Sequence, residues 1–125
     1  FGEAMAADYA GVTEIDEDVQ NFISELKKQG HVVGILANIP SGVARKLREV
    51  HGTWLDSLDA VLFSCDIDTA KPEPKAFQLA IGALGVPAGE ITFIDDRQAN
   101  VNAAREEGMM AVHYTDFHAL KAELS

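Results

Sequence analysis

The residues best suited to chemistry are two adjacent acids, Asp95 and Asp96, and a lysine, Lys71, that precedes Pro72. Adjacent carboxylates repel each other, so a cation usually neutralises them, and oxygen donors completed by water suit Mg²⁺. A lysine aimed at the same point would supply a compact positive charge for a phosphate or for a carboxylate nucleophile. Taken alone, these residues are also explained by Asp96 capping a helix and by Lys71 lying exposed in a loop.

Further polar residues could complete such a site. Asn38 follows an apolar run over 32–37, and Ser41 with Gly42 opens the next predicted helix, whose free N–H groups could hold a phosphate. Asn100 lies about one helical turn beyond the acid pair. The combination of acid pair, lysine and these residues favours a site for a metal ion and a phosphate over the two structural explanations.

Alternating helices and strands must position these residues. Helices are predicted over 17–28 (with Asp16 as its cap), up to about residue 50 with Ser41 as the cap, over 74–84, around 101–105 and over 117–124. Strands are predicted over 32–37, 59–64, 90–94 and 110–114. Strands that are apolar on both faces indicate a mostly parallel sheet covered by helices on both sides. The sequence therefore predicts a doubly wound α/β domain, in which ligands bind beyond the carboxyl ends of the strands.

Composition excludes several classes of function. The chain has 125 residues, which fits one domain, and its net charge of −10 argues against a nucleic-acid partner. No apolar run approaches the length of a membrane span, and no signal peptide is visible at the N-terminus. Cys65 is the single cysteine, which excludes an internal disulfide and agrees with a cytoplasmic location.

Three segments resemble, in order and spacing, the second, third and fourth motifs of the haloacid dehalogenase-like (HAD) hydrolases: 35–38, 71–74 and 93–101. The likeness covers about 15–125 and implies a HAD-like Rossmannoid core. The paired acids Asp95 and Asp96 resemble those of the Mg²⁺-dependent phosphatases in this family, which the metal-independent dehalogenases lack. The resemblance thus implies hydrolysis of a small phosphorylated metabolite, for example a sugar phosphate.

The resemblance also implies a role for each candidate residue. Lys71 matches the charge-balancing lysine, Asp95 and Asp96 match the Mg²⁺ ligands, and Asn100 matches a supporting residue of the same loop. The resemblance assigns phosphate binding to Asn38, to Ser41 and to the position of Ala37. The family has Ser or Thr where this chain has Ala37, so one hydrogen-bond donor to the phosphoryl group is missing.

The nucleophile motif of the family, Asp-x-Asp-x-Thr/Ser after an apolar strand, is not found. The segment 16–18 has the Asp-x-Asp spacing, but no apolar strand precedes it and it is better explained as a helix cap. We therefore expect the first, central strand to be missing, with 1–14 a remnant of a helical cap domain or a linker and 15–125 a partial core. The first residue, Phe1, suggests a chain whose beginning has been removed.

Three consequences follow from a missing central strand. The nucleophile would lie upstream of this chain, so these 125 residues alone would be inactive. The gap in the sheet would expose unpaired strand edges. We expect a separate N-terminal segment, a homodimer partner or closure of the flanking strands to fill it.

Two other functions stay open. A non-catalytic HAD-like domain for binding or scaffolding would explain Ala37 and the missing nucleophile equally well. A phosphoacceptor receiver domain also uses an acid pair and a lysine, but there the acid pair comes first in the chain, whereas here Lys71 precedes Asp95 and Asp96.

Overall fold

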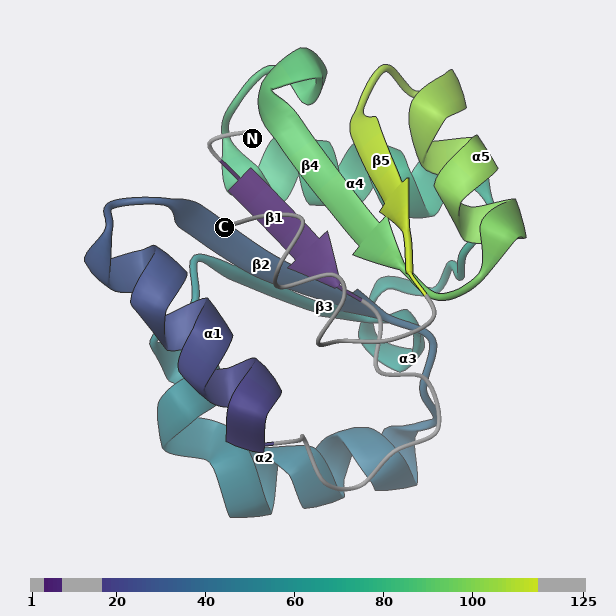
Figure 1. Ribbon diagram of the computed structural model, residues 1–125. Helices are drawn as coiled ribbons and strands as arrows, with labels where there is room; N and C mark the ends of the chain where they lie inside the picture. The colour runs from purple at the N-terminus through teal and green to yellow at the C-terminus, as the bar shows by residue number, and fades with distance from the viewer. Residues whose placement is uncertain (1–3, 8–16, 115–125) are drawn as a thin grey trace.

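Among the residues that the computed structural model describes, 4–7 and 17–114, one sheet of five parallel strands has the order β3-β2-β1-β4-β5 (Figure 1). The strands are β1 (Ala4–Ala7), β2 (Val32–Ala37), β3 (Ala60–Phe63), β4 (Ile91–Asp95) and β5 (Met110–His113). Every neighbouring pair is parallel, so all strands end at the same edge. The predicted α/β fold with a parallel sheet is confirmed.

β1 occupies the central place that the sequence analysis left empty. Its last residue, Ala7, stands opposite Ile35 of β2 on one side and opposite Ile94 of β4 on the other. The prediction of a missing central strand is therefore wrong, and no separate segment, partner chain or closure of the flanking strands is needed there. Three of its four residues are alanine, which is depleted in strands, so its sequence gives little sign of the pairing on both sides.

The position of β1 also bears on the predicted boundary between a cap remnant or linker over 1–14 and a core over 15–125. Residues 4–7 are part of the core sheet and not of a cap or linker. The rest of 1–14, the predicted cap residue Asp16 and the predicted helix over 117–124 lie outside the described residues.

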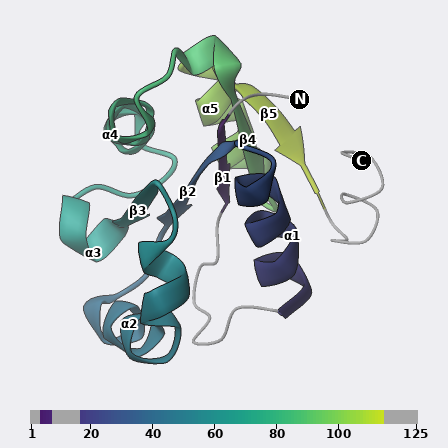
Figure 2. The same ribbon diagram turned by 90° about the vertical axis from the view of Figure 1, so that its left-hand side faces the viewer.

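Helices cover both faces of the sheet. Figure 2 shows α4 (Pro74–Leu84) on one side and α1 (Glu17–Lys28) and α2 (Ser41–Asp56) on the other. Helix α5 (Gln98–Glu106) packs on the α4 side, through Ala104 in the cluster that holds Phe77 and Phe93. Two short elements, α3 (Ser64–Ile67) and the 3₁₀ helix η1 (Ala88–Glu90), were not predicted. None of the helices in the described ranges is long and apolar enough to cross a membrane.

Helix α2 differs from its predicted form at both ends. It begins after Pro40, which takes the N-cap position, so Ser41 is the first residue of the helix and not its cap. It continues past the predicted end at residue 50 to Asp56, through a kink at His51 where φ is −119° and ψ is 17°. The added turn is held because Leu55 is buried in the cluster between α2 and the sheet.

The packing of α4 sets the position of the loop that carries Lys71. A Cβ on Gly34 of β2 would lie 2.9 Å from Leu84 Cδ2 and 3.1 Å from the Ala60 carbonyl oxygen, so glycine lets α4 approach the sheet closely. Further along, Phe77 of α4 meets Phe93 of β4 edge to face, with ring centroids 5.3 Å apart. The helix that follows the Lys71 loop is thereby fixed against β2 and β4.

Asp59 joins the start of β3 to its surroundings. Its Oδ2 accepts hydrogen bonds from Lys27 Nζ at 2.6 Å and from the Val33 N–H at 2.7 Å. Burial raises the pKa of Asp59, but these hydrogen bonds together outweigh burial and the pKa lies below its ordinary value of 3.8. A lowered pKa stabilises the fold above pH 3.8, and this stabilisation is lost as the pH falls through the folded-state pKa.

We expect Asp59→Asn to lower the free energy of unfolding by about 1 kcal/mol at neutral pH. The difference from the unmodified chain should shrink progressively below the ordinary pKa of 3.8. Urea unfolding of both proteins across a pH series measures it, with Glu106→Gln, at an exposed position of α5, as the control. A destabilisation that stays constant with pH would show that the charge of Asp59 contributes nothing.

Candidate active site

Lys71 lies buried where β2 and β4 end. Its Nζ donates hydrogen bonds to the Leu36 carbonyl oxygen at 2.8 Å and to Asp95 Oδ2 at 3.0 Å, and neither the Lys71 nor the Asp95 side chain is accessible to solvent. The same Nζ lies 5.5 Å from the centroid of the Phe93 ring. Lys71 is therefore no exposed loop charge, and its ammonium group links the two strands that flank β1.

The carboxylate of Asp95 is held from three sides. Besides the bond from Lys71, Oδ2 accepts one from Asn100 Nδ2 at 3.1 Å, and Oδ1 accepts one from the Arg97 N–H at 2.8 Å. Asn100 is itself buried, on the first turn of α5. Removing one partner of such a buried, hydrogen-bonded ion pair strongly destabilises a fold, because the other charge stays buried without compensation.

Asn38 holds the main chain of Lys71. Its Nδ2 donates to the Lys71 carbonyl oxygen at 2.9 Å, and its Oδ1 accepts from the Lys71 N–H, also at 2.9 Å. This pair of bonds joins the end of β2 to the loop before α4, where the Lys71–Pro72 peptide is cis. Asn38, predicted to bind phosphate, is placed by the structure where it orients Lys71.

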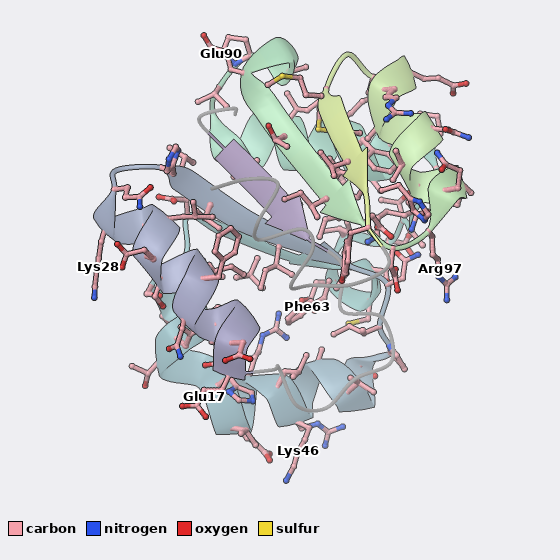
Figure 3. The ribbon with its side chains drawn as sticks, viewed as in Figure 1. Glu17, Lys28, Lys46, Phe63, Glu90 and Arg97 are labelled. Atoms are coloured by element: carbon pink, nitrogen blue, oxygen red, sulfur yellow. The ribbon has the colours of Figure 1, made fainter. Side chains whose placement is uncertain are left out.

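Asp96 is exposed beside the buried pair. Its carboxylate makes no hydrogen bond or ion pair with the described part of the chain, while its carbonyl oxygen lies 3.0 Å from Nε2 of His113 at the end of β5. The next residue, Arg97, extends from the surface where β4 ends, as Figure 3 shows. Asp96 therefore presents to solvent, at the carboxyl edge of the sheet, a negative charge that no described residue pairs with.

Asp95 and Asp96 were predicted as magnesium ligands, and the structure places the first in the buried ion pair and the second exposed beside it. Nowhere in 4–7 or 17–114 do three His, Cys, Asp or Glu side chains gather as a complete set of metal ligands. Lys71 balances the charge of Asp95 but not that of Asp96, and among the described residues Oδ1 of Asp95 accepts a single hydrogen bond. Carboxylate oxygens of this kind fit Mg²⁺, which keeps water as its other ligands, and a further carboxylate would complete the set.

The other two predicted phosphate-binding positions are not joined to this cluster. Ala37 is fully buried and packs in the apolar cluster that contains Leu47 of α2 and Phe63 of β3. Ser41 lines a depression with Arg45, and no hydrogen bond within the described ranges links it to the Lys71–Asp95 pair. Neither position therefore supplies a described hydrogen-bond donor beside Lys71.

Asp8, which is not among the predicted site residues, follows the last residue of β1 and lies outside the described residues. Ala7 stands opposite Ile35 and Ile94, and the residues after those two are Leu36 and Asp95, the two acceptors of Lys71. The sequence signal for a nucleophile at this place is a run of four apolar residues, 4–7, followed by the acid Asp8. The signal was weak because the strand is mostly alanine and because Ala10 stands where an Asp-x-Asp pattern has its second acid.

Comparison with known proteins gives one family. Residues 2–108 match the haloacid dehalogenase-like hydrolases. Among curated proteins, the chain is 32% identical to the sesquiterpene phosphatase astK of Aspergillus oryzae, over 98% of this chain and 64% of that protein. It is 33% identical to Phosphatase MT3486 of Mycobacterium tuberculosis, over 87% of this chain and 50% of that protein. The chain thus spans between half and two thirds of the length of these relatives.

A solved structure covers nearly the same length. An uncharacterized protein from Corynebacterium glutamicum superimposes with a TM-score of 0.82 at 31% identity, over 99% of this chain and 93% of the other. Since the family match begins at residue 2, it includes β1 and the residues that follow it.

Proposed function

This chain belongs to the haloacid dehalogenase-like hydrolases, and we propose that it hydrolyses phosphate monoesters of small metabolites with Asp8 as the nucleophile. The observation that carries the proposal is the buried Lys71–Asp95 pair, which joins the two strands on either side of β1. The names of the two curated relatives, both phosphatases, support the reaction class. The earlier expectation of an upstream nucleophile depended on a missing central strand, and that strand is present.

The reaction would run in two displacements. A carboxylate oxygen of Asp8 attacks phosphorus, the ester P–O bond breaks, and the leaving oxygen takes its proton from solvent. Water then attacks the phosphoryl-aspartate, which releases inorganic phosphate and restores the Asp8 carboxylate. The ammonium of Lys71 offsets the negative charge that builds up on the phosphoryl oxygens, and Asn38 and Asp95 hold that ammonium in place.

Asp96 and Oδ1 of Asp95 would hold Mg²⁺ together with Asp8. Bound Mg²⁺ would supply further positive charge to the phosphoryl oxygens. Asn100 and the Arg97 N–H fix the Asp95 carboxylate so that it keeps one orientation with or without the ion. Lys71 neutralises Asp95. The two remaining negative charges, those of Asp8 and Asp96, would match the charge of a divalent cation.

The residue two positions after Asp8 is Ala10, where family members carry the carboxylate that acts as general acid and base. Without that acid, leaving groups that need no protonation are expected to react fastest, so an aryl phosphate is the best first substrate.

The direct test is hydrolysis of p-nitrophenyl phosphate by the full chain with Mg²⁺ and after chelation by EDTA, followed by a panel of alkyl and sugar phosphates. We expect turnover with Mg²⁺, a loss of about a hundredfold or more on chelation, and slower reaction of the alkyl esters. Circular dichroism in EDTA checks that the fold persists. If no phosphate ester is hydrolysed with or without Mg²⁺, the chain is a non-catalytic member of the family.

Ala37 is the observation that favours this non-catalytic alternative, since the position lacks the usual hydroxyl group. We expect Ala37→Ser to change kcat/KM by less than about twofold, because the added hydroxyl would lie in the apolar cluster with Leu47 and Phe63 and not beside Lys71. Ala37→Val adds volume without a hydroxyl and serves as the matched control, with no expected gain. Binding of phosphate without turnover in both the unmodified chain and Ala37→Ser would support a binding or scaffold role.

A further inference from the structure

One side chain joins the segments that follow β2 and β3. The two strands pair up to Ala37 and Phe63, and the next residues in the chain are Asn38 and Ser64. Ser64 Oγ accepts a hydrogen bond from the Ile39 N–H at 3.0 Å and donates one to the Ile39 carbonyl oxygen at 3.2 Å. A hydroxyl can do both, because it carries one proton and two lone pairs. Ser64 therefore continues the contact between the strands beyond the end of their backbone pairing.

The hydroxyl of Ser64 is not used to cap its own helix. Ser64 is the first residue of α3, and Phe63 holds the N-cap position, without a side-chain hydrogen bond to the helix. A capping hydroxyl accepts from an N–H two or three residues further along the same helix, whereas both bonds of Ser64 reach a residue 25 positions earlier. Ile39 also packs in the same apolar cluster as Phe63. The contact of Ser64 is therefore with the turn between β2 and α2.

This turn also carries Asn38, which holds Lys71. Asn38 is adjacent to Ile39 and repeats the pattern of Ser64, since its side chain bonds both the N–H and the carbonyl oxygen of Lys71 at 2.9 Å. Two side chains in succession thus each fix both main-chain polar groups of one residue. The connected bonds run from Ser64 through the turn to Lys71, whose ammonium pairs with Asp95.

The loop that carries Lys71 is closed on itself. Glu73 Oε1 accepts hydrogen bonds from the Ala70 N–H at 3.0 Å and from Thr69 Oγ1 at 3.3 Å, and the Glu73 N–H donates to the Ala70 carbonyl oxygen at 2.9 Å. A loop with such internal bonds moves as a unit when its attachment is displaced. A shift of Asn38 would therefore move the main chain from which the Lys71 ammonium extends.

We propose that Ser64 is a positioning residue for Lys71, acting through the Ile39 main chain and the Asn38 side chain. The catalytic part of this inference rests on the proposed phosphatase function, in which the ammonium offsets charge on the phosphoryl oxygens. Ser64 does not contact the substrate in this proposal. It sets where the turn holds the Lys71 loop, and a misplaced charge-balancing group lowers the rate because the transition state needs it at one place.

The kinetic test is hydrolysis of p-nitrophenyl phosphate by the full chain with Ser64→Ala. We expect kcat to fall about five- to tenfold while KM changes less than about twofold, since Lys71 acts on charge that builds up in the transition state. Asn38→Ala should lower kcat at least as much. In the Asn38→Ala background, Ser64→Ala should cost less than about a further twofold, because the link through Asn38 is already broken. A general loss of stability would not produce this dependence.

Ser57→Ala is the matched control. Its Oγ also donates to a main-chain oxygen, that of Trp54, but at the C-terminal end of α2, before β3 begins. The same chemical change there should leave kcat within about twofold of the unmodified chain. Urea unfolding verifies that every variant is folded under the assay conditions.

Amide hydrogen exchange, followed by NMR, tests the link without turnover. In the unmodified chain, the N–H groups of Ile39 and Lys71 should have protection factors within about threefold of each other, because one opening of the turn releases both. Ser64→Ala should speed exchange of the Lys71 N–H about tenfold, and Ser57→Ala should leave it unchanged. The comparison in the unmodified chain decides the link even if Ser64→Ala does not fold.

The outcomes separate the two proposals. If no phosphate ester is hydrolysed but exchange at Ile39 and Lys71 is linked, the phosphatase proposal alone is overturned. The positioning role of Ser64 is overturned by unlinked exchange of the two N–H groups, or by an unchanged kcat in a folded, active Ser64→Ala protein. A loss of kcat that is equally large in the Asn38→Ala background would also overturn it.

Discussion

Asp8→Asn is expected to reduce hydrolysis of p-nitrophenyl phosphate by at least about a thousandfold, because the amide cannot act as the attacking carboxylate. Asp8 directly follows Ala7, the last residue of β1, which lies between Ile35 of β2 and Ile94 of β4. The fold should be unaffected by so conservative a change, which urea unfolding can verify. Rapid quenching followed by peptide mass spectrometry should find a phosphoryl group on the Asp8 peptide of the unmodified chain.

The controls for Asp8 are Asp16 and Asp18, the acids of the segment 16–18 that has the Asp-x-Asp spacing. Asp16→Asn and Asp18→Asn should keep most of the activity, since Asp18 lies on the first turn of α1. If Asp8→Asn kept full activity while one of these two variants lost it, the nucleophile would be assigned to the wrong segment. Phosphoryl transfer to any other residue would lead to the same conclusion.

Lys71→Met is expected to lower kcat by about a hundred- to a thousandfold and to cost about 3–5 kcal/mol in the free energy of unfolding. The loss of stability arises because the Asp95 carboxylate would stay buried without its cation, and the Leu36 carbonyl oxygen would lose its donor. Lys75→Met is the matched control, because Lys75 is exposed at the start of α4 and should change neither quantity.

The double variant Lys71→Met with Asp95→Asn separates catalysis from stability. With both charges of the Lys71–Asp95 ion pair removed, it should be more stable than Lys71→Met alone, yet it should remain inactive. Urea unfolding and the p-nitrophenyl phosphate assay on all four proteins of the cycle measure both effects. Recovery of activity along with stability would show that Lys71 serves the fold only.

The candidate residues that were recognised in the sequence share one property, which is that each follows an apolar strand in an ordered motif. Lys71, Asp95 and Asn100 were found in this way, and the structure joins them by hydrogen bonds. The role of Asn38 could not be predicted, because its two bonds to the Lys71 main chain depend on how the β2–α2 turn meets a loop 33 residues away. A linear pattern carries no information on that contact.

The sequence by itself determined the family, the parallel α/β fold and the edge of the sheet at which the polar residues collect. These follow from local patterns: apolar strands, helix ends and short motifs that retain their order. Only the tertiary structure decided that Ala4–Ala7 is a central strand, because an alanine-rich segment becomes a strand through pairing with β2 and β4 on both sides. That pairing also made Asp8 the candidate nucleophile, and burial against β2 and β4 decided that the ammonium of Lys71 pairs with Asp95.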